Sequence, residues 1–250
     1  MTFIFNLKKD PIDKRDIPFK LKVSTPVKLP EEYDLKKSCP PIISQGNLGA
    51  CGPNQISQNL KFLLKKQKSV VFQPSRLFIY YFSRVLDNSD IREDTGITLR
   101  SGLKSISKFG VCNETEWKYN TTDFTKKPND QVIEKALFYT KNFKYNSVLQ
   151  TEQNIKEVIY SGFPVLFGLD IYSSFQSSKA LKTGIVPFPN TVKEQKLGGH
   201  AMSIIGWNKT HFIVSNTWGK NFGDEGYFYI DYNYILNQDL SNSFWTCSYF

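Results

Sequence analysis

The chain has 250 residues, of which 40% are apolar and 15% aromatic, so it can bury a substantial core as one large domain or two small ones. No apolar run approaches the roughly 18 residues of a membrane helix, and residues 1–7 lack the pattern of a secretory signal. The net charge of +9 comes from lysines and arginines scattered along the chain, which disfavours a nucleic-acid partner. We therefore expect an intracellular, cytoplasmic protein with no membrane partner.

The four cysteines and two histidines limit the chemistry further. The cysteines form no Cys-x-x-Cys pair and are too sparse for a disulfide scaffold, which leaves open whether Cys39, Cys112 and Cys247 pair. With only two histidines, a zinc site is not expected. The sequence predicts neither a metal nor a cofactor.

The first half of the chain is predicted to be mostly helical. Residues 1–30 are rich in Lys, Asp and Pro without a sustained apolar period, so we predict an arm that lies on or off the body. Helical spacing of apolar residues predicts a helix over 51–64. The run 77–82 fits a buried helix or strand, and a further helical pattern over 99–109 ends at Gly110, which suits a C-terminal cap.

The second half changes to strands after a helix predicted over 151–160. Helices segregated from an antiparallel sheet predict an α+β protein with two lobes, and a cleft between lobes is a common place for a site. The strand-like runs lie at 165–169, 201–206, 211–215 and 226–232.

The first candidate for chemistry is Cys51. The run Gln45-Gly46-Asn47-Leu48-Gly49-Ala50-Cys51-Gly52-Pro53 predicts a glycine-loosened loop that delivers a thiol to the start of a helix. A helix N-terminus and a cationic imidazole lower a cysteine pKa from about 8.5 to roughly 3.5–7.5, and the thiolate is the reactive form. The Cys51 backbone N–H and the Gln45 side-chain amide are candidate donors to an oxyanion.

The second candidate is a histidine and asparagine pair. If residues 207–210 form a hairpin turn, the ladder sets Ala201 opposite Asn216, and His200 becomes a neighbour of Asn216. The imidazole would then act as base and acid while the amide fixes its tautomer. His211, one residue inside the next strand, is interpreted as a packing or surface residue.

Each of these residues also has a plainer interpretation. Cysteine is among the most buried residue types, and an isolated Gln or Asn is usually solvated. Glycines at 46 and 49 can simply make a turn. The combination of the loop, the downstream histidine and the Asn-x-Trp-Gly run favours chemistry.

Together these motifs resemble the papain-like cysteine peptidases of the cathepsin superfamily. Gln-Gly-x-x-Gly-x-Cys at 45–51, Gly-His-Ala at 199–201 and Asn-Thr-Trp-Gly-Lys-Asn-Phe-Gly-Asp-Glu-Gly-Tyr at 216–227 occur in family order. The resemblance covers roughly residues 30 to 250. Further matches at 74–78, 94–96 and 101–104 look like the bacterial and large-virus branch without a long pro-region.

The resemblance implies a papain-like fold within a peptidase domain of residues 31–250, with a helical lobe mainly at 45–130 and a β-rich lobe mainly at 131–250. Such a monomer would hydrolyse peptide or protein substrates through a thioester acyl-enzyme, without a cofactor. By resemblance, Cys51 is the nucleophile, His200 the acid and base, Asn216 its orienter, Gln45 the oxyanion donor, Gly96, Gly199 and Ala201 substrate contacts, and Trp218 the shield of the His–Asn bond. A plain turn at Gly96 and a core position for Trp218 remain the alternatives.

Three departures from the family pattern stand out. Leu48 replaces a cysteine of many relatives, so their disulfide cannot form, which agrees with a reducing compartment. Gly52 and Phe222 replace aromatic residues, and the loss at Gly52 removes packing beneath the site. The long pro-region is missing, which leaves residues 1–30 as a short pro-segment, a strap or a tail.

Three other functions compete with a simple peptidase. The same site serves an isopeptidase or deubiquitinase, or an exopeptidase. A catalytically silent structural or virion protein could keep the fold and use its cleft or basic surface. Intact Gln45, Cys51, His200 and Asn216 count against a silent protein, which has no chemical need for all four. A viral origin would add packaging in a virion to the expected locations.

Overall fold

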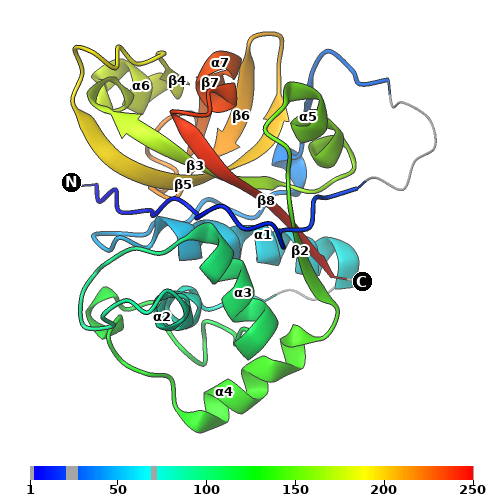
Figure 1. Ribbon diagram of the computed structural model, residues 1–250, viewed down its shortest axis with the longest axis vertical. Coiled ribbons are helices and arrows are strands. Elements are labelled where there is room, and N and C mark those ends of the chain that lie inside the picture. Colours follow the sequence, from blue (N-terminus) through cyan, green and yellow to red (C-terminus); the bar gives the residue numbers. More distant parts are fainter. Residues whose placement is uncertain (1–2, 21–27, 69–71, 250) are drawn as a thin grey trace.

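Two lobes meet along the middle of the molecule, one built of helices and one around a sheet (Figure 1). The computed structural model describes residues 3–20, 28–68 and 72–249. The predicted α+β architecture is confirmed. The main helices before the sheet are α1 (Cys51–Lys68), α2 (Arg76–Leu86), α3 (Leu99–Phe109) and α4 (Asp130–Leu137).

Local capping sets the boundaries of α2 and α3. The Ser75 side chain accepts a hydrogen bond from the Phe78 N–H at the start of α2, and Thr98 does the same for Ser101 at the start of α3. Gly110 closes α3 as predicted, with a φ of 73° that favours glycine. The run 77–82 belongs to α2 and is therefore helical.

A small apolar cluster of its own stabilises the far end of the helical lobe, where α4 packs against α3 and side chains of α2 and α4 share the cluster (Figure 1). The Asn129 side chain caps α4 by accepting from the Val132 N–H. The buried members of this cluster are Phe78, Tyr81, Phe82, Cys112, Val132 and Ala136.

Buried polar side chains fix α1 against the sheet. Gln55 Nε2 donates to Ser215 Oγ at 2.8 Å, and Asn59 Oδ1 accepts from Ser203 Oγ at 3.0 Å. All four side chains are buried. A buried polar group left without its partner costs about 1–3 kcal/mol, so these bonds hold α1 in one position relative to the strands. The N-terminus of α1 is thereby placed against the β-rich lobe.

The sheet of the β-rich lobe has eight strands within the described residues, in the order β2-β8-β3-β5-β6-β7-β4, with β1 paired to β5. Its pairs are antiparallel except for β4 with β7. The strands are β1 (Tyr33–Asp34), β2 (Phe143–Ser147), β3 (Val165–Tyr172), β4 (Ile185–Val186), β5 (Lys196–Trp207), β6 (His211–Ser215), β7 (Tyr227–Asp231) and β8 (Ser241–Tyr249).

The predicted strands exist, but three of them differ in length. β3 continues to Tyr172, three residues beyond the predicted end at 169. β5 begins at Lys196, five residues before the predicted start at 201, because it continues along β3 through Gly198 and Gly199. β7 ends at Asp231, whose side chain accepts from the Asn233 N–H and starts a helix. The other helices in this lobe are α5 (Glu152–Tyr160), close to the predicted 151–160, α6 (Ser178–Thr183) and α7 (Tyr232–Leu236).

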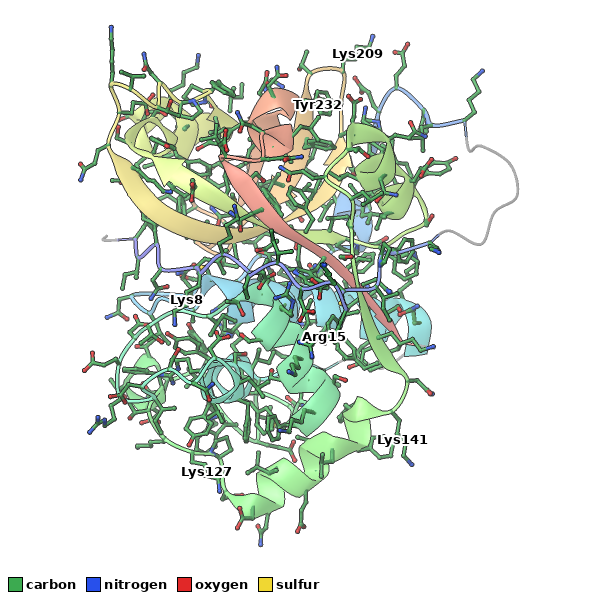
Figure 2. The ribbon with its side chains drawn as sticks, viewed as in Figure 1. Lys8, Arg15, Lys127, Lys141, Lys209 and Tyr232 are labelled. Atoms are coloured by element: carbon green, nitrogen blue, oxygen red, sulfur yellow. The ribbon has the colours of Figure 1, made fainter. Side chains whose placement is uncertain are left out.

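The β5–β6 hairpin differs from the predicted register. Trp207 pairs with Phe212 rather than with Thr210, so the loop is longer than predicted, and a bulge between Ile204 and Gly206 shifts the ladder by one residue. The predicted pairing of Ala201 with Asn216 is therefore wrong. Lys209, at the tip, lies at the end of the β-rich lobe far from the arm (Figure 2).

The N-terminal arm, residues 3–20 as described, lies on the body and runs between the two lobes (Figure 1). Asn6 forms a parallel bridge with Gly199 of β5, and Lys8 forms one with Thr98 before α3. The labelled side chains of Lys8 and Arg15 mark its course (Figure 2). The arm therefore contacts both lobes at once.

Three further findings bear on the chemistry. All four cysteines are free thiols. Within the described ranges, no group of three acidic, histidine or cysteine side chains is placed to hold a metal ion. No helix in those ranges is long and apolar enough to cross a bilayer.

Candidate active site

Cys51 is the first residue of α1 and its side chain is almost fully buried. The first N–H groups of a helix lack intrahelical acceptors, so the thiol lies beside free donors. The loop before it is held at Gln45, whose N–H donates to Thr217 O at 2.8 Å. Gly46 takes a φ of 65°, which favours glycine there. The thiol is therefore placed at the helix start, as the sequence predicts.

His200 and Asn216 lie together in the β-rich lobe, both fully buried. His200 Nε2 is 2.7 Å from Asn216 Oδ1. Because an amide oxygen can only accept, Nε2 carries the proton and Nδ1 of the neutral ring is left as the basic nitrogen. Nδ1 is buried and has no hydrogen-bond partner in the described part of the chain. An unpartnered basic nitrogen is available for a proton.

The indole of Trp218 covers this pair. Its ring centroid lies 5.2 Å from that of His200, and its side chain is buried. Phe175 and Phe228 meet the indole edge-on from behind. The predicted shield therefore lies next to the histidine and is also part of the core.

Gln45 is buried beside the same elements. Its Oε1 accepts from Thr217 Oγ1 at 2.7 Å, and its Nε2 donates to Leu48 O at 3.0 Å. The Oε1 bond fixes which end of the amide is the donor, and Leu48 O uses one of the two Nε2 hydrogens. The second hydrogen remains for an acceptor at the Cys51 loop.

The N-terminal arm covers these residues. The Leu7 N–H donates to Gly199 O at 3.0 Å and the Lys8 N–H donates to Ile97 O at 2.9 Å. Phe3 stacks on Trp218, and the ring of Phe5 meets that of His200 edge-on at 5.6 Å. The arm thus adds an extended strand between the lobes, directly over the candidate site.

Glycines make room for the arm's Leu7. A Cβ added to Gly168 would lie 2.8 Å from Leu7 Cδ2, and one added to Gly199 would lie 2.4 Å from Leu7 O. A Cβ on Gly52 would contact Ile97 at 3.1 Å and Leu7 Cδ1 at 3.5 Å. Gly52 follows the cysteine at the position where the family has an aromatic residue. The space of that aromatic side chain is therefore occupied by Ile97 and Leu7.

Gly96 and Ala201 also lie at the site, each with a particular contact. Gly96 has a φ of 66°, and a Cβ there would lie 1.9 Å from Asn6 O, so no side chain fits beneath the arm. Its N–H donates to Tyr80 Oη at 3.2 Å, while the backbone group that pairs with the arm is the neighbouring Ile97 carbonyl. Ala201, fully buried, presents its N–H to the Cys51 thiol.

Burial keeps the thiol and the imidazole neutral beneath the arm. It raises the pKa of Cys51 to about 11, although nearby N–H groups, the largest effect being that of Ala201, lower it. Burial also lowers the pKa of His200 to about 4, against the opposing hydrogen bond to Asn216. A thiolate and imidazolium pair is therefore disfavoured while the arm is in place.

Sequence reasoning missed the part of the arm that touches the site. Phe5 and Leu7 alternate with the polar Asn6 and Lys8, and such a period of two is typical of an extended strand, although the apolar Ile4 interrupts it before Phe5. Downstream, Asp10 Oδ2 accepts from Trp245 Nε1 at 2.6 Å, and Asp16 pairs with Arg100 at 2.5 Å. The short alternation is the feature of the sequence that could have indicated this strand. The contacts of Asp10 and Asp16 join residues distant in sequence and leave no such pattern.

Comparison with known proteins gives a consistent result. Residues 85–244 match the model of the family described as "Papain family cysteine protease". An uncharacterized peptidase C1-like protein of Acanthamoeba polyphaga mimivirus is 38% identical over 268 aligned residues, which cover 96% of this chain and 85% of that protein.

Solved structures agree with the sequence matches. Xylellain, a cysteine protease from Xylella fastidiosa, superimposes with a TM-score of 0.90 at 32% identity, covering 98% of this chain and 96% of that one. Digestive procathepsin L 3 of the Tenebrio molitor larval midgut has a TM-score of 0.72 at 17% identity, covering 97% of this chain and 76% of that one. The latter likeness shows the fold alone.

Proposed function

We propose that this chain, which belongs to the papain family of cysteine proteases, cleaves peptide bonds with Cys51, His200 and Asn216 and is latent while its N-terminal arm fills the cleft. The observation that carries this proposal is the placement of an unpartnered His200 Nδ1 and a buried Cys51 thiol beneath the same strand of the arm. Proteases of this family act on peptide or protein substrates.

The proposed reaction begins when the arm leaves. Water then reaches the thiol and the imidazole, which removes the cause of both pKa shifts and favours transfer of the Cys51 proton to His200 Nδ1. The thiolate attacks the substrate carbonyl carbon, and Gln45 Nε2 with the Cys51 N–H donates to the oxygen that becomes negative.

Collapse of this intermediate breaks the C–N bond. His200 Nδ1 returns its proton to the leaving amine, and a thioester to Cys51 remains. His200 then takes a proton from water, whose oxygen attacks the thioester and releases the acid and the free thiol. Throughout, the Asn216 bond to Nε2 keeps Nδ1 as the reacting nitrogen.

The proposal divides the chain into an arm, residues 1–30, and a peptidase domain, residues 31–250, that acts as a monomer without a nucleic-acid or membrane partner. The arm is proposed to be a short inhibitory segment. Four free thiols suit a reducing compartment, so we propose that the enzyme acts inside a cell.

Labelling tests the proposal directly. The intact chain and a Phe3→Ala variant are treated with an epoxide that alkylates papain-like thiols, and the adduct is located by peptide mapping. We expect the adduct at Cys51, with faster labelling of the variant. Cys51→Ala should lose both adduct and peptide turnover, whereas Cys112→Ala, which alters another buried thiol, should keep both. Turnover that survives Cys51→Ala would contradict the assignment.

A further inference from the structure

A chain of hydrogen bonds joins the Cys51 loop to the edge that pairs with the arm. The Gly49 N–H, two residues before the thiol, donates to Asp94 Oδ2 at 2.8 Å. The Tyr80 hydroxyl donates to the other carboxylate oxygen of Asp94. Tyr80 Oη in turn accepts from the Gly96 N–H at 3.2 Å. Asp94 and Tyr80 therefore link the loop of the nucleophile to the residue before Ile97.

Burial of Tyr80 and the contacts of Arg84 hold this link in place. Tyr80 is fully buried, and the Arg84 guanidinium lies 4.2 Å from its ring centroid. Arg84 Nη1 donates to Ile91 O at 2.7 Å and to Glu93 O at 2.9 Å, which fixes the segment that leads to Asp94. Burial also raises the pKa of Tyr80, so its hydroxyl stays protonated and remains a donor.

The two ends of this link have different tasks in the proposed reaction. The Ile97 carbonyl accepts from the extended strand of the arm, which shows how the edge receives a peptide backbone. The Cys51 thiol must meet the carbonyl of that same backbone. Reacting atoms must approach each other to about 3–3.5 Å. The distance between the Ile97 carbonyl and the Cys51 thiol therefore determines how well a substrate bound at both groups can react.

We propose that Asp94 and Tyr80 are positioning residues that set Cys51 against the Ile97 edge, and so make the enzyme selective for extended peptides over small thiol reagents. This inference rests on the proposed function. Asp94 accepts hydrogen bonds from the nucleophile loop and from Tyr80, and Tyr80 in turn accepts one from the edge. Neither residue is assigned a contact with the reacting atoms.

The test compares two reactions of Cys51 in the intact chain. One is kcat/KM for a peptide long enough to pair with Ile97, and the other is the alkylation rate constant for iodoacetamide, which is too small to reach that edge. Both reactions require that the arm has left the site and that the site is folded. The ratio of kcat/KM to the alkylation rate constant is therefore insensitive to a change in arm release or in folding. A merely structural role would leave this ratio unchanged.

The variants are Asp94→Ala and Tyr80→Phe, with two matched controls. Asp90→Ala removes a carboxylate from the same loop whose side-chain partner is Arg92. Tyr81→Phe removes the hydroxyl of the neighbouring tyrosine. In Asp94→Ala and in Tyr80→Phe, we expect the ratio of peptide kcat/KM to the iodoacetamide rate constant to fall roughly tenfold. This is the loss typical of one hydrogen bond to a charged group. The controls should change it less than about twofold.

Three further results bear on the inference. Because both residues act through one link, the double variant should show a ratio no lower than Asp94→Ala alone. Asp94→Asn, which keeps an acceptor for Gly49, should restore part of the ratio. If Asp94→Ala does not fold, Tyr80→Phe alone decides, since it removes a single oxygen atom.

The outcomes separate this inference from the proposed function. If wild-type turnover depends on Cys51 but the ratio is unchanged in Tyr80→Phe and in folded Asp94→Ala, only the positioning role is overturned. If neither the wild type nor the opened Phe3→Ala variant shows turnover or a label at Cys51, the proposed function is overturned and the inference with it.

Discussion

The ring of Phe3 stacks on the indole of Trp218, with ring centroids 4.0 Å apart. Phe5 follows two residues later against the same indole and against His200. These contacts lie where the proposed mechanism requires the histidine to meet water and a leaving amine. The end of the arm therefore covers the imidazole.

Phe3→Ala should open the site. Fully burying a phenylalanine contributes about 1.5–3 kcal/mol, and an aromatic pair adds about 0.5–1.5 kcal/mol. Phe3 is partly buried, so its loss should raise the rate of Cys51 alkylation by roughly tenfold. Ile12→Ala is the matched control, because that arm side chain is 100% exposed. Equal rates for Phe3→Ala and Ile12→Ala would show that the stacking does not hold the arm.

Alkaline conditions should also release the arm. The arm-covered state raises the pKa of Cys51 to about 11, so closure is fully favoured below the lower pKa of the open thiol and loses this contribution as pH rises toward 11. In Phe3→Ala the midpoint of alkylation against pH should move to lower pH than in the wild type. Iodoacetamide kinetics between pH 5 and 11 measure it, and superimposable profiles would count against burial as the cause.

Acid should weaken closure through His200. Burial under the arm lowers the pKa of His200 to about 4, so closure is favoured above the ordinary value of about 6.5 and loses that contribution as pH falls toward 4. Asp10 works in the opposite direction, because burial raises its pKa and protonation then favours closure. Asp10→Asn should therefore steepen arm release on acidification, monitored by tryptophan fluorescence. A shallower transition would contradict this assignment.

Asn216→Ala should lower kcat with KM little changed, because the lost hydrogen bond orients the imidazole in the transition state. A drop of roughly tenfold to a hundredfold is expected from the loss of one buried hydrogen bond to a group that becomes charged. His211→Ala provides a control, since its ring bonds Thr210 Oγ1 at the hairpin instead. Steady-state kinetics of both variants test this prediction. An unaltered kcat in Asn216→Ala would show that Asn216 takes no part in the mechanism.

Gly52→Phe should expel Leu7. A side chain at this position would compete with Ile97 and Leu7 for one space, so alkylation of Cys51 should become faster. The effect should shrink in a Leu7→Ala background, because the two changes relieve the same contact. Fully additive effects on the alkylation rate would mean that Gly52 and Leu7 do not share that space.

The sequence predicts the two-lobe fold and the pairing of His200 with Asn216, although it predicts the wrong hairpin register. A bulge between Ile204 and Gly206 and a longer loop shift the ladder, and neither has a clear local pattern. Asn216 nevertheless lies just beyond the last paired residue, Ser215, within side-chain reach of the histidine. The neighbourhood of two strand ends is therefore easier to predict than the exact pairing.

The position of the arm could not be predicted in the same way. Its anchors join residues far apart in sequence, as Asp10 does with Trp245, and no periodic pattern marks them. The Asp94–Tyr80 hydrogen bond could not be predicted from the sequence either. Asp94 belongs to a short motif that also fits a plain turn. Long-range polar contacts of this kind become visible only in the fold.

The arm belongs to the same chain as the cleft it fills, so its local concentration at the site is set by the chain and not by the amount of protein. Tethered segments of this kind compete at effective concentrations of roughly millimolar. Dilution should therefore leave the enzyme latent, and a peptide substrate must either bind more tightly than the arm or wait for its transient departure.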